Sequence, residues 1–337
     1  MMTPRYDIVG CGAVVQQYHL PVLMLLQDQG ELSVAGCYDR DTSLAERVAG
    51  LLGAERYGAG AAPRADDGVS AALVATPPPS HAAIAGEYLR AGKSAFVEKP
   101  FTTTVSEAAE LVSESREGGA RVVVDHFWRF YPSANVARQW LSDQIDQVER
   151  VEASEGFRWA WATASNYVVE DRFGGVIHDT GAHLIDMILY LLGLDEAGES
   201  GSVELGRVGK VPAGEPSHEC SAELSLKGPD EIEVPVALTI TRLSPVARGI
   251  RVHGAFGTLF VPCSFAHAPI LFRGGTSFRL RGAAARAEPA EPGGCFLLAH
   301  RDFLAAIREP DAPSRIDGAR FLLLTEILES LHGEAAR

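Results

Sequence analysis

The fold class is decided by residues 6–15, which read Tyr6-Asp7-Ile8-Val9-Gly10-Cys11-Gly12-Ala13-Val14-Val15. The apolar run predicts a strand, and the glycine pair predicts a tight turn that opens a helix. Such a turn lets the backbone approach a pyrophosphate at the helix N-terminus, although a glycine pair also occurs in purely structural turns. Val15 replaces the third glycine of the usual fingerprint, a position that serves helix–strand packing more than phosphate contact. We therefore expect this turn to bind a dinucleotide, through Gly10, Gly12, Ala13, Val14 and Val15.

Strands and helices alternate along the rest of the first 125 residues. This order predicts βαβ units and a mostly parallel sheet, an N-terminal Rossmann domain over residues 1–126. Thr104 and Glu107 form the pattern of a capping box at the start of one helix. The expected strands are 6–10, 32–38, 71–75, 95–98 and 122–125, and the expected helices are 13–27, 42–52, 81–91 and 105–117.

After about residue 147 the pattern changes to longer strands joined by Gly/Pro turns. This change predicts a second, C-terminal α+β domain over residues 127–337, with a large, mostly antiparallel open sheet. A loop is expected at 283–295. The expected strands are 148–157, 203–209, 219–227, 234–242, 249–254 and 258–261, and the expected helices are 179–192, 296–307 and 317–331.

Composition excludes several classes of protein. The net charge of −14 argues against a nucleic-acid surface, which needs clustered lysine and arginine. The five cysteines include no C-x-x-C pair, which favours a reducing compartment and no metal site. A strand begins almost at once, so we expect no signal peptide, and the apolar runs are too short for a bilayer. These features predict a cytoplasmic protein that does not contact membranes.

Asp39 ends the second expected strand, where an acidic side chain binds the adenosine ribose in dinucleotide-binding folds. A carboxylate at this position repels a 2′-phosphate, so NAD is favoured as the cofactor. Arg40 follows directly and is able to stack on adenine or bind a phosphate, so NADP is not excluded as the cofactor. Asp39 is also a candidate cap for the helix expected from Thr42.

Two further strand ends carry candidate residues. Thr76 and Pro77 begin a proline-rich loop that leads into His81, which is either near the cofactor or simply a residue of the first helical turn. Glu98 and Lys99 follow the apolar strand 95–97, and both are expected to contact the cofactor. The chain has only four lysines, and a lysine, unlike an arginine, releases its proton near neutral pH. Lys99 is therefore a candidate acid/base.

Asp179 and His183 are spaced i, i+4 on the expected helix 179–192 and so share one face. A carboxylate near the helix N-terminus is able to orient an imidazole, but a satisfied structural pair is the alternative. Asp186 lies on the same face, and we expect a structural role for it.

Together these residues resemble the glucose-fructose oxidoreductase / inositol dehydrogenase / rhizopine-catabolism (Gfo/Idh/MocA) family over nearly the whole chain. The resemblance rests on the glycine turn and on a set of short motifs. These motifs are Val74-Ala75-Thr76-Pro77 with His81, Glu98-Lys99-Pro100, Arg129-Phe130-Tyr131-Pro132, Gly174-Gly175 with Asp179, His183 and Asp186, and the segments His253-Gly254 and Gly257-Thr258-Leu259.

The resemblance implies reversible oxidation of a secondary alcohol on a sugar or cyclitol, with Lys99, Asp179 and His183 as the catalytic group. It also implies homodimers or homotetramers formed through the C-terminal sheet. His183 is then the primary base or acid, Lys99 binds the same oxygen or shares the relay, and Asp179 fixes the His183 tautomer or holds a substrate hydroxyl. The chain departs from the family pattern at Val15, Pro78, Asp125, Phe127, Phe173 and His178.

Substrate contacts are expected from three further residues besides the catalytic group. Arg129 is assigned through its match to the family motif. Arg158 and Tyr167 belong to a segment that alternates aromatic and polar residues and suits a polyol, although the same pattern fits core or subunit interface.

Several functions remain open at the level of sequence. The leading prediction is an NAD(P)-dependent dehydrogenase or reductase of a sugar, cyclitol or sugar derivative. The alternatives are a 3-keto nucleotide-sugar reductase in deoxysugar or natural-product biosynthesis, an NAD-dependent glycosidase, and a non-catalytic NAD-binding regulator.

Overall fold

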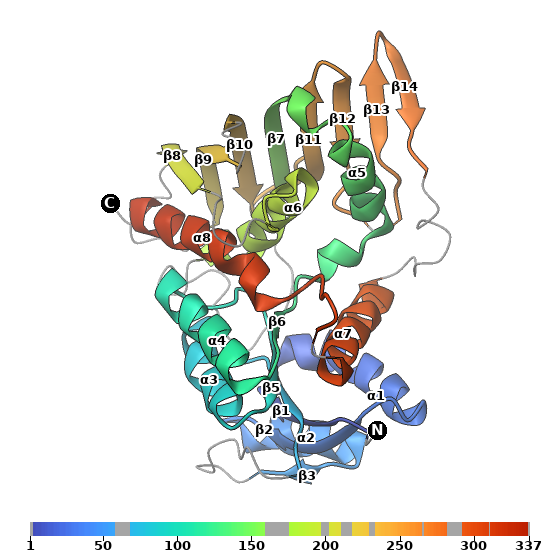
Figure 1. The fold of residues 1–337 in the computed structure, drawn as a ribbon, viewed down its shortest axis with the longest axis vertical. Coiled ribbons are helices and arrows are strands. Elements are labelled where there is room, and N and C mark those ends of the chain that lie inside the picture. The colour runs from blue at the N-terminus through green and yellow to red at the C-terminus, as the bar shows by residue number, and fades with distance from the viewer. Residues whose placement is uncertain are drawn as a thin grey trace. The chain divides into compact units, whose positions relative to one another are not determined.

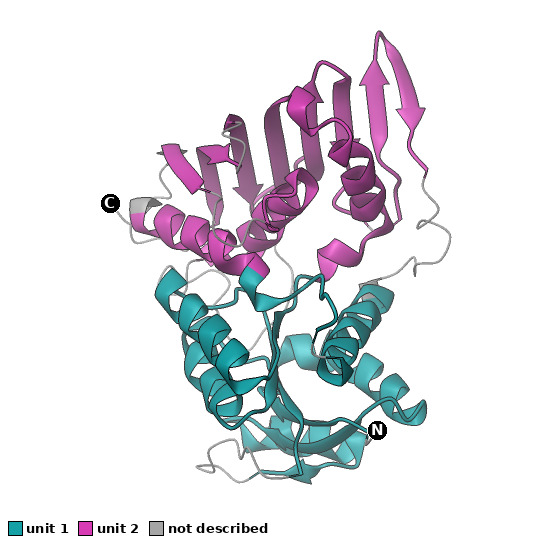
Figure 2. Ribbon diagram, in the orientation of Figure 1, with its two compact units in different colours: residues 1–126, 292–319 teal, residues 127–291, 320–337 magenta. Residues whose placement is uncertain are grey.

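The protein is described from a computed structural model. The described residues are 3–57, 68–158, 175–196, 202–209, 218–228, 233–264, 266–281, 292–309 and 311–335. They divide into two compact units, coloured separately in Figure 2: residues 1–126 with 292–319, and residues 127–291 with 320–337. Residues 292–319 thus group with the first unit, whereas the sequence prediction placed everything after residue 126 in the second.

Unit 1 contains a six-stranded sheet in the order β3-β2-β1-β4-β5-β6 (Figure 1). Every neighbouring pair is parallel, and the order is that of a dinucleotide-binding Rossmann sheet. The predicted strands are confirmed to within a residue or two at each end. The strands are β1 (Arg5–Val9), β2 (Ser33–Tyr38), β3 (Glu55–Arg56), β4 (Ala71–Val74), β5 (Ser94–Val97) and β6 (Val122–Val124).

The helices of unit 1 follow the predicted order. The capping box of α4 is confirmed, because Thr104 and Glu107 bond each other's backbone amides. Asp41, and not Asp39, caps α2 through the amide of Ser43. The helical elements are η1 (Val15–His19), α1 (Leu20–Asp28), α2 (Thr42–Leu52), η2 (Pro78–Ser80), α3 (His81–Arg90), α4 (Val105–Gly118) and α7 (Pro292–Arg308).

The first helix contains a π turn that the sequence pattern did not predict. The amide of Leu20 donates to the carbonyl of Val15, and Pro21 follows directly in α1. Proline has no N–H, so the ordinary bond to the carbonyl four residues earlier is missing here. A π turn next to this gap accommodates one extra residue in the helix, and His19 is its last residue.

Residues 292–319 join unit 1 through specific contacts. Helix α7 packs on α1 and η1, and Val123 of β6 bridges to Asp317. The guanidinium of Arg121 also lies 2.7 Å from the Asp317 carboxylate. The loop prediction for 283–295 is wrong over residues 292–295, which form the first turn of α7.

Unit 2 contains an eight-stranded sheet in the order β14-β13-β12-β11-β7-β10-β9-β8. The β7–β10 pair is parallel and the other pairs are antiparallel, so the predicted mostly antiparallel sheet is confirmed. The strands are β7 (Val148–Gly156), β8 (Ser202–Gly209), β9 (Glu219–Lys227), β10 (Glu233–Thr241), β11 (Gly249–Gly254), β12 (Gly257–Val261), β13 (Ile270–Arg273) and β14 (Thr276–Arg279).

The helices of unit 2 contact one face of this sheet, with α6 on β7, α5 on β12 and α8 on β8. Buried and exposed residues alternate strictly along most of β9 and β10, so the other face of these strands is open. The sequence prediction missed α5 and the β13–β14 hairpin. The helical elements are η3 (Phe127–Phe130), α5 (Pro132–Ser142), η4 (Ile145–Gln147), η6 (Ile177–Gly181), α6 (Ala182–Leu192) and α8 (Leu322–Ala335), with η8 (Gly318–Phe321) spanning the point where the chain passes from one unit to the other.

Two further observations concern the cysteines and the length of the apolar helices. All five cysteines are buried and carry free thiols. Within the described segments, no helix combines the length and the apolar content that a membrane crossing requires.

Candidate functional site

The carboxyl ends of the unit 1 strands bring together the predicted cofactor residues. Gly10 follows β1, Asp39 follows β2, Thr76 comes after β4, and Glu98 follows β5. In open parallel sheets this edge, near the point where the strand order reverses, is where ligands bind. In unit 1 the reversal lies between β1 and β4, so the glycine turn and the Thr76 loop border it.

The two glycines of the turn meet different surroundings. Gly10 has φ +94°, and a Cβ placed there would lie 2.4 Å from the carbonyl oxygen of Ala75. Glycine is therefore required at residue 10 by the fold. A Cβ at Gly12 would have no neighbouring atom within 4 Å. Because packing within the protein does not demand glycine at residue 12, its open side is available to a ligand.

Asp39 is held against the glycine turn. Its Oδ2 accepts a hydrogen bond of 2.7 Å from the amide of Cys11, and its Oδ1 accepts one of 2.8 Å from the amide of Asp41. Asp39 is partly exposed and the next residue, Arg40, is exposed. This placement fits a carboxylate that holds ribose hydroxyls beside the pyrophosphate-binding turn. The first helical residues, Ala13 and Val14, are partly exposed next to it, whereas Val15 is buried, as a packing residue should be.

His81 connects two of the loops at this edge. Its Nε2 lies 2.7 Å from the carbonyl oxygen of Thr76, and its Nδ1 lies 2.9 Å from that of Pro100. The side chain is completely buried, and burial lowers the pKa of His81. A buried ring cannot touch a cofactor at the surface, so His81 acts on the site only through the loops that it joins. Pro77 on the Thr76 loop is exposed.

Glu98 and Lys99 occupy the loop after β5. The backbone amide of Lys99 donates to Oε2 of Glu98 over 3.1 Å. The Glu98 side chain is buried, whereas Lys99 is partly exposed. Glu98 thus lies beneath the loop and Lys99 lies at its surface, where an ammonium group is able to reach a ligand.

In unit 2, Asp179 lies in the π turn η6 and His183 in the first turn of α6. The Asp179 carboxylate forms an ion pair with Arg242, which comes from the end of β10. It also accepts a hydrogen bond of 3.2 Å from the hydroxyl of Thr180. The guanidinium of Arg242 lies 4.4 Å above the ring of Phe157, so Asp179 faces a cation that is itself fixed. Phe157 belongs to the aromatic–polar segment noted in the sequence, whereas Arg242 was not singled out there.

His183 packs among aromatic rings. Its imidazole stacks on Trp128, with ring centroids 4.8 Å apart and planes inclined by 10°, and meets Phe127 edge-on at 5.3 Å. Both aromatic residues belong to η3. An imidazole stacked on an indole face is held in one plane. The signal for Trp128 in the sequence was its place beside the family motif at Arg129.

Arg129 does not fit the predicted substrate contact. Its side chain is completely buried, and it forms ion pairs with Asp186 at 2.6 Å and with Asp195 at 2.9 Å. Its guanidinium also lies 4.3 Å over the ring of Phe321. A buried cation held by two carboxylates stabilises α6 and the chain that follows it, so we assign Arg129 a structural role. Asp186 is its main partner, as a structural role for that residue requires.

The remaining predicted substrate residues differ in placement. Arg158 is exposed just after β7. Tyr167 lies outside the described residues, as do Phe173 and Gly174.

Comparisons with known proteins agree with the unit 1 fold. Residues 5–126 match the family model GFO_IDH_MocA, described as an oxidoreductase family with an NAD-binding Rossmann fold. The chain is 28% identical over 193 residues to inositol 2-dehydrogenase of Rhizobium meliloti, covering 57% of this chain and 56% of that protein. It is 29% identical over 186 residues to dTDP-3,4-didehydro-2,6-dideoxy-alpha-D-glucose 3-reductase of Saccharopolyspora spinosa, covering 53% of each. The matches therefore span about half the length of these relatives.

Solved structures extend the likeness of fold to both units. An inositol dehydrogenase homolog from Azotobacter vinelandii, complexed with NAD+, superimposes with a TM-score of 0.81 at 18% identity, covering 99% of this chain and 95% of that one. The glycine turn, the strand order and the family match agree with one another. Residues 5–126 therefore match the NAD-binding Rossmann fold of this oxidoreductase family, in agreement with the resemblance seen in the sequence.

Proposed function

We propose that the protein is an NAD(P)-dependent oxidoreductase that interconverts a secondary alcohol and a ketone on a sugar, cyclitol or sugar derivative. The observation that supports this most directly is Gly12, whose open side is not needed by the fold, beside Asp39 at the carboxyl edge of a Rossmann sheet. The relatives named above act on an inositol and on a nucleotide-linked keto-sugar, which supports this class of substrate.

Gly10, Gly12, Ala13, Val14 and Val15 would form the turn that holds the cofactor pyrophosphate, Asp39 the ribose site, and Thr76 and Pro77 the neighbouring wall. Glu98 and His81 would support this site from below. When bound, the nicotinamide would supply the position that accepts or donates hydride.

Alcohol oxidation also requires removal of the hydroxyl proton, and the reverse reaction requires its return. In the proposal, His183 is the primary acid/base and Lys99 binds the reacting oxygen or shares the proton. Asp179 fixes the tautomer of His183 or holds a hydroxyl group of the substrate. Trp128 holds the His183 ring in one plane, which fixes the direction in which its nitrogens exchange protons. Arg158 and Tyr167 remain candidate substrate contacts.

We further propose NAD as the preferred cofactor, because the Asp39 carboxylate would repel a 2′-phosphate at the ribose. Exposed Arg40 is the residue that would permit NADP. Fluorescence titration with NADH and NADPH tests this choice, and tighter binding of NADPH would reverse it.

A 3-keto nucleotide-sugar reductase is the second candidate, since one relative bears that activity in its name. An NAD-dependent glycosidase and a non-catalytic NAD-binding regulator are the remaining alternatives. A panel of inositols, hexoses and keto-sugars, followed at the nicotinamide absorbance, separates them. Release of an aglycone without net NADH indicates the glycosidase, and normal NAD binding without any turnover indicates the regulator.

The decisive test replaces Lys99→Met and His183→Ala separately and together. Each single change is expected to lower kcat about 10²-fold, with the NADH dissociation constant nearly unchanged. If both residues serve one step, the kcat of the double variant should be only slightly lower than that of the less active single variant. Arg158→Met is the matched control for loss of an exposed cation: it is expected to change KM and not kcat. Near-normal kcat in both single variants would refute the assignment.

A further inference from the structure

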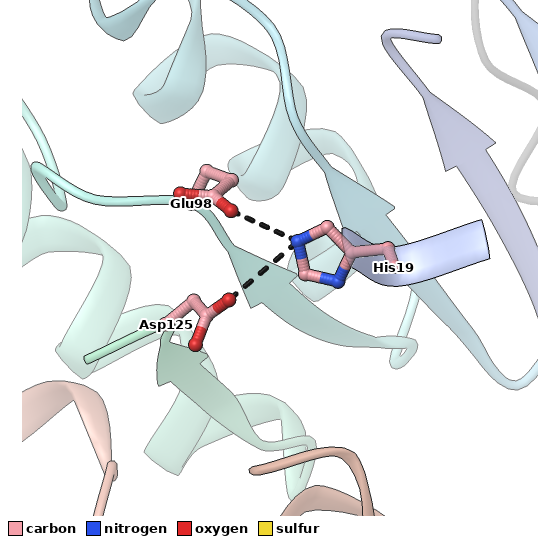
Figure 3. A group of neighbouring side chains, drawn as sticks. All are labelled: His19, Glu98 and Asp125. Carbon is pink, nitrogen blue, oxygen red and sulfur yellow. Dashed lines mark hydrogen bonds and ion pairs between the residues drawn. The ribbon is translucent and has the colours of Figure 1, made fainter. Parts of the chain in front are cut away.

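Both carboxylate oxygens of Glu98 are engaged inside unit 1. Oε2 accepts the backbone amide of Lys99 over 3.1 Å, and Oε1 accepts Nε2–H of His19 over 2.8 Å. Figure 3 shows His19 between Glu98 and Asp125, whose Oδ2 lies 3.5 Å from the same nitrogen. His19 is completely buried and stands at the end of the π turn next to Pro21. Glu98 therefore joins the first helix to the Lys99 loop.

The contact continues to α7. Nδ1 of His19 lies 2.9 Å from Nε2 of His300, which is also completely buried. Among the described residues Nδ1 of His300 has no hydrogen-bond partner. A bare ring nitrogen is less costly to bury than an unpaired N–H, so the His300 proton belongs on Nε2. The resulting chain runs in one direction: His300 donates to His19, His19 donates to Glu98, and Glu98 accepts the Lys99 amide.

We propose that His300 and His19 are positioning residues, which act through Glu98 to fix the backbone and the charge environment of Lys99. This inference rests on the proposed function, because it presumes that Lys99 serves the reaction. It also assigns a role to α7, since this helix supplies His300, the first donor in a series of hydrogen bonds that ends at the Lys99 loop.

The electrostatics agree with this geometry. Burial alone would raise the pKa of Glu98, but the hydrogen bond from His19, together with the charge of Lys99, outweighs it and lowers that pKa. Burial holds the pKa of His300 well below its ordinary value. A neutral His300 below an ionised Glu98 leaves negative charge directly under Lys99. Among the described residues, further ionisable groups that face this cluster are Asp125, His81 and Tyr6.

The same three side chains, His19, Glu98 and Asp125, have ligand atoms close enough to hold a metal ion. We favour the hydrogen-bonded chain, in which Nε2 of His19 carries the proton that Glu98 accepts over 2.8 Å and is therefore not available to a metal. Metal analysis of the purified protein checks this choice. A stoichiometric ion lost together with activity on chelation would overturn the positioning proposal.

The low number of lysines allows a direct readout. Reductive ¹³C-methylation labels the four lysine side chains, and the resonance missing in Lys99→Met identifies Lys99. In Glu98→Gln the titration midpoint of this resonance is expected to move about one pH unit lower, since a neighbouring negative charge favours the ammonium form. An unchanged midpoint would refute the charge part of the proposal. This measurement needs no substrate, so it stands even if the proposed reaction is wrong.

The positioning part is tested in the full chain by His300→Leu and His300→Gln. Glutamine supplies an N–H near the position of the histidine Nε2, whereas leucine fills similar volume without a donor. The leucine variant is expected to lose about tenfold in kcat, because small displacements of a reacting group are costly, with NADH affinity unchanged. The glutamine variant is expected to recover most of this loss. Equal activity in the two variants would refute the role of His300.

Tyr6→Phe is the matched control. Tyr6 is buried in the same core, and its ring centroid lies 6.5 Å from that of His300. Its hydroxyl has no hydrogen-bond partner among the described residues. This change should leave kcat and the Lys99 titration as in the unaltered protein. If Lys99→Met keeps full activity, the proposed function fails. If Lys99→Met is inactive while His300→Leu and Glu98→Gln behave normally, only the present inference fails.

Discussion

Gly10 and Gly12 offer a matched pair of substitutions within one turn. Gly10→Ala should lower the free energy of unfolding by about 1–3 kcal/mol, because the new Cβ meets the Ala75 carbonyl and the backbone has a positive φ. Gly12→Ala should leave stability nearly unchanged, since its Cβ meets no atom. It should nevertheless weaken NADH binding at least tenfold, because the methyl group takes the space proposed for the pyrophosphate. Urea unfolding and fluorescence titration measure the two effects, and wild-type affinity in Gly12→Ala would contradict the proposed cofactor turn.

His300 also gives stability a pH dependence. Because its pKa is lowered in the folded protein, the unfolded chain takes up a proton near pH 6.5 that the folded protein does not. The contribution of neutral His300 to the free energy of unfolding is therefore fully present above pH 6.5. It is lost as the pH falls below this value, by up to about 1.4 kcal/mol per pH unit. Urea unfolding at pH 7.5 and 5.5 should show a smaller loss in His300→Gln than in the unaltered protein. An equal loss would mean that His300 is protonated in the fold.

Individual residues show what the sequence could and could not predict. Thr104, Glu107 and Gly10 act through neighbours in the chain or through their own backbone, so their roles were readable from local pattern. The partners of Arg129 and His19 are dozens to hundreds of positions away, and nothing local indicates them. Arg129 was accordingly predicted to contact the substrate, although its guanidinium is buried and forms ion pairs with Asp186 and Asp195.

At the level of elements, the unit 1 strands were predicted well because they are short, continuous apolar runs, as in β4 and β5. Strands of unit 2 such as β9 and β10 were predicted from their period of two. The π turns η1 and η6 were not, because apolar periodicity cannot reveal one extra residue in a turn. Both contain residues of the candidate sites, His19 and Asp179. Helix α5 was missed even though Pro132 stands at its first turn, a typical start signal.

The open face of the unit 2 sheet is the element expected to mediate assembly. Ala237 of β10 and Glu223 of β9 are exposed there and line a depression of about 400 Å³ with Arg150. If two copies meet through this face, Ala237→Arg should place an uncompensated charge in the interface and produce a smaller species in light scattering. Glu326→Arg on helix α8 is exposed elsewhere and serves as the control. A monomeric unaltered protein, or an Ala237→Arg variant of unchanged mass, would contradict the predicted interface.

For the whole chain, the unexpected feature is that residues 292–319 complete the Rossmann unit. The sequence could not show this, because the helix pattern of α7 states only that one face is apolar and not what covers it. In the structure the ring of Phe96 in β5 packs against two rings of α7, with centroid distances of 4.7 Å to His300 and 5.4 Å to Phe303. Removing α7 would therefore expose a large apolar surface on unit 1, together with the buried nitrogen of His19.

This predicts how fragments of the protein behave. A fragment of residues 1–126 alone should aggregate or show no cooperative unfolding, because its core is open where α7 belongs. The same fragment joined by a flexible Gly/Ser linker to residues 292–319 should unfold cooperatively and bind NADH, as measured by urea titration and fluorescence. A linked fragment carrying Phe303→Asp, which destroys the packing on Phe96, is the control and should resemble the short fragment. Stable, cofactor-binding behaviour of residues 1–126 without α7 would show that the helix is an accessory and that the dinucleotide site is complete before the chain leaves unit 1.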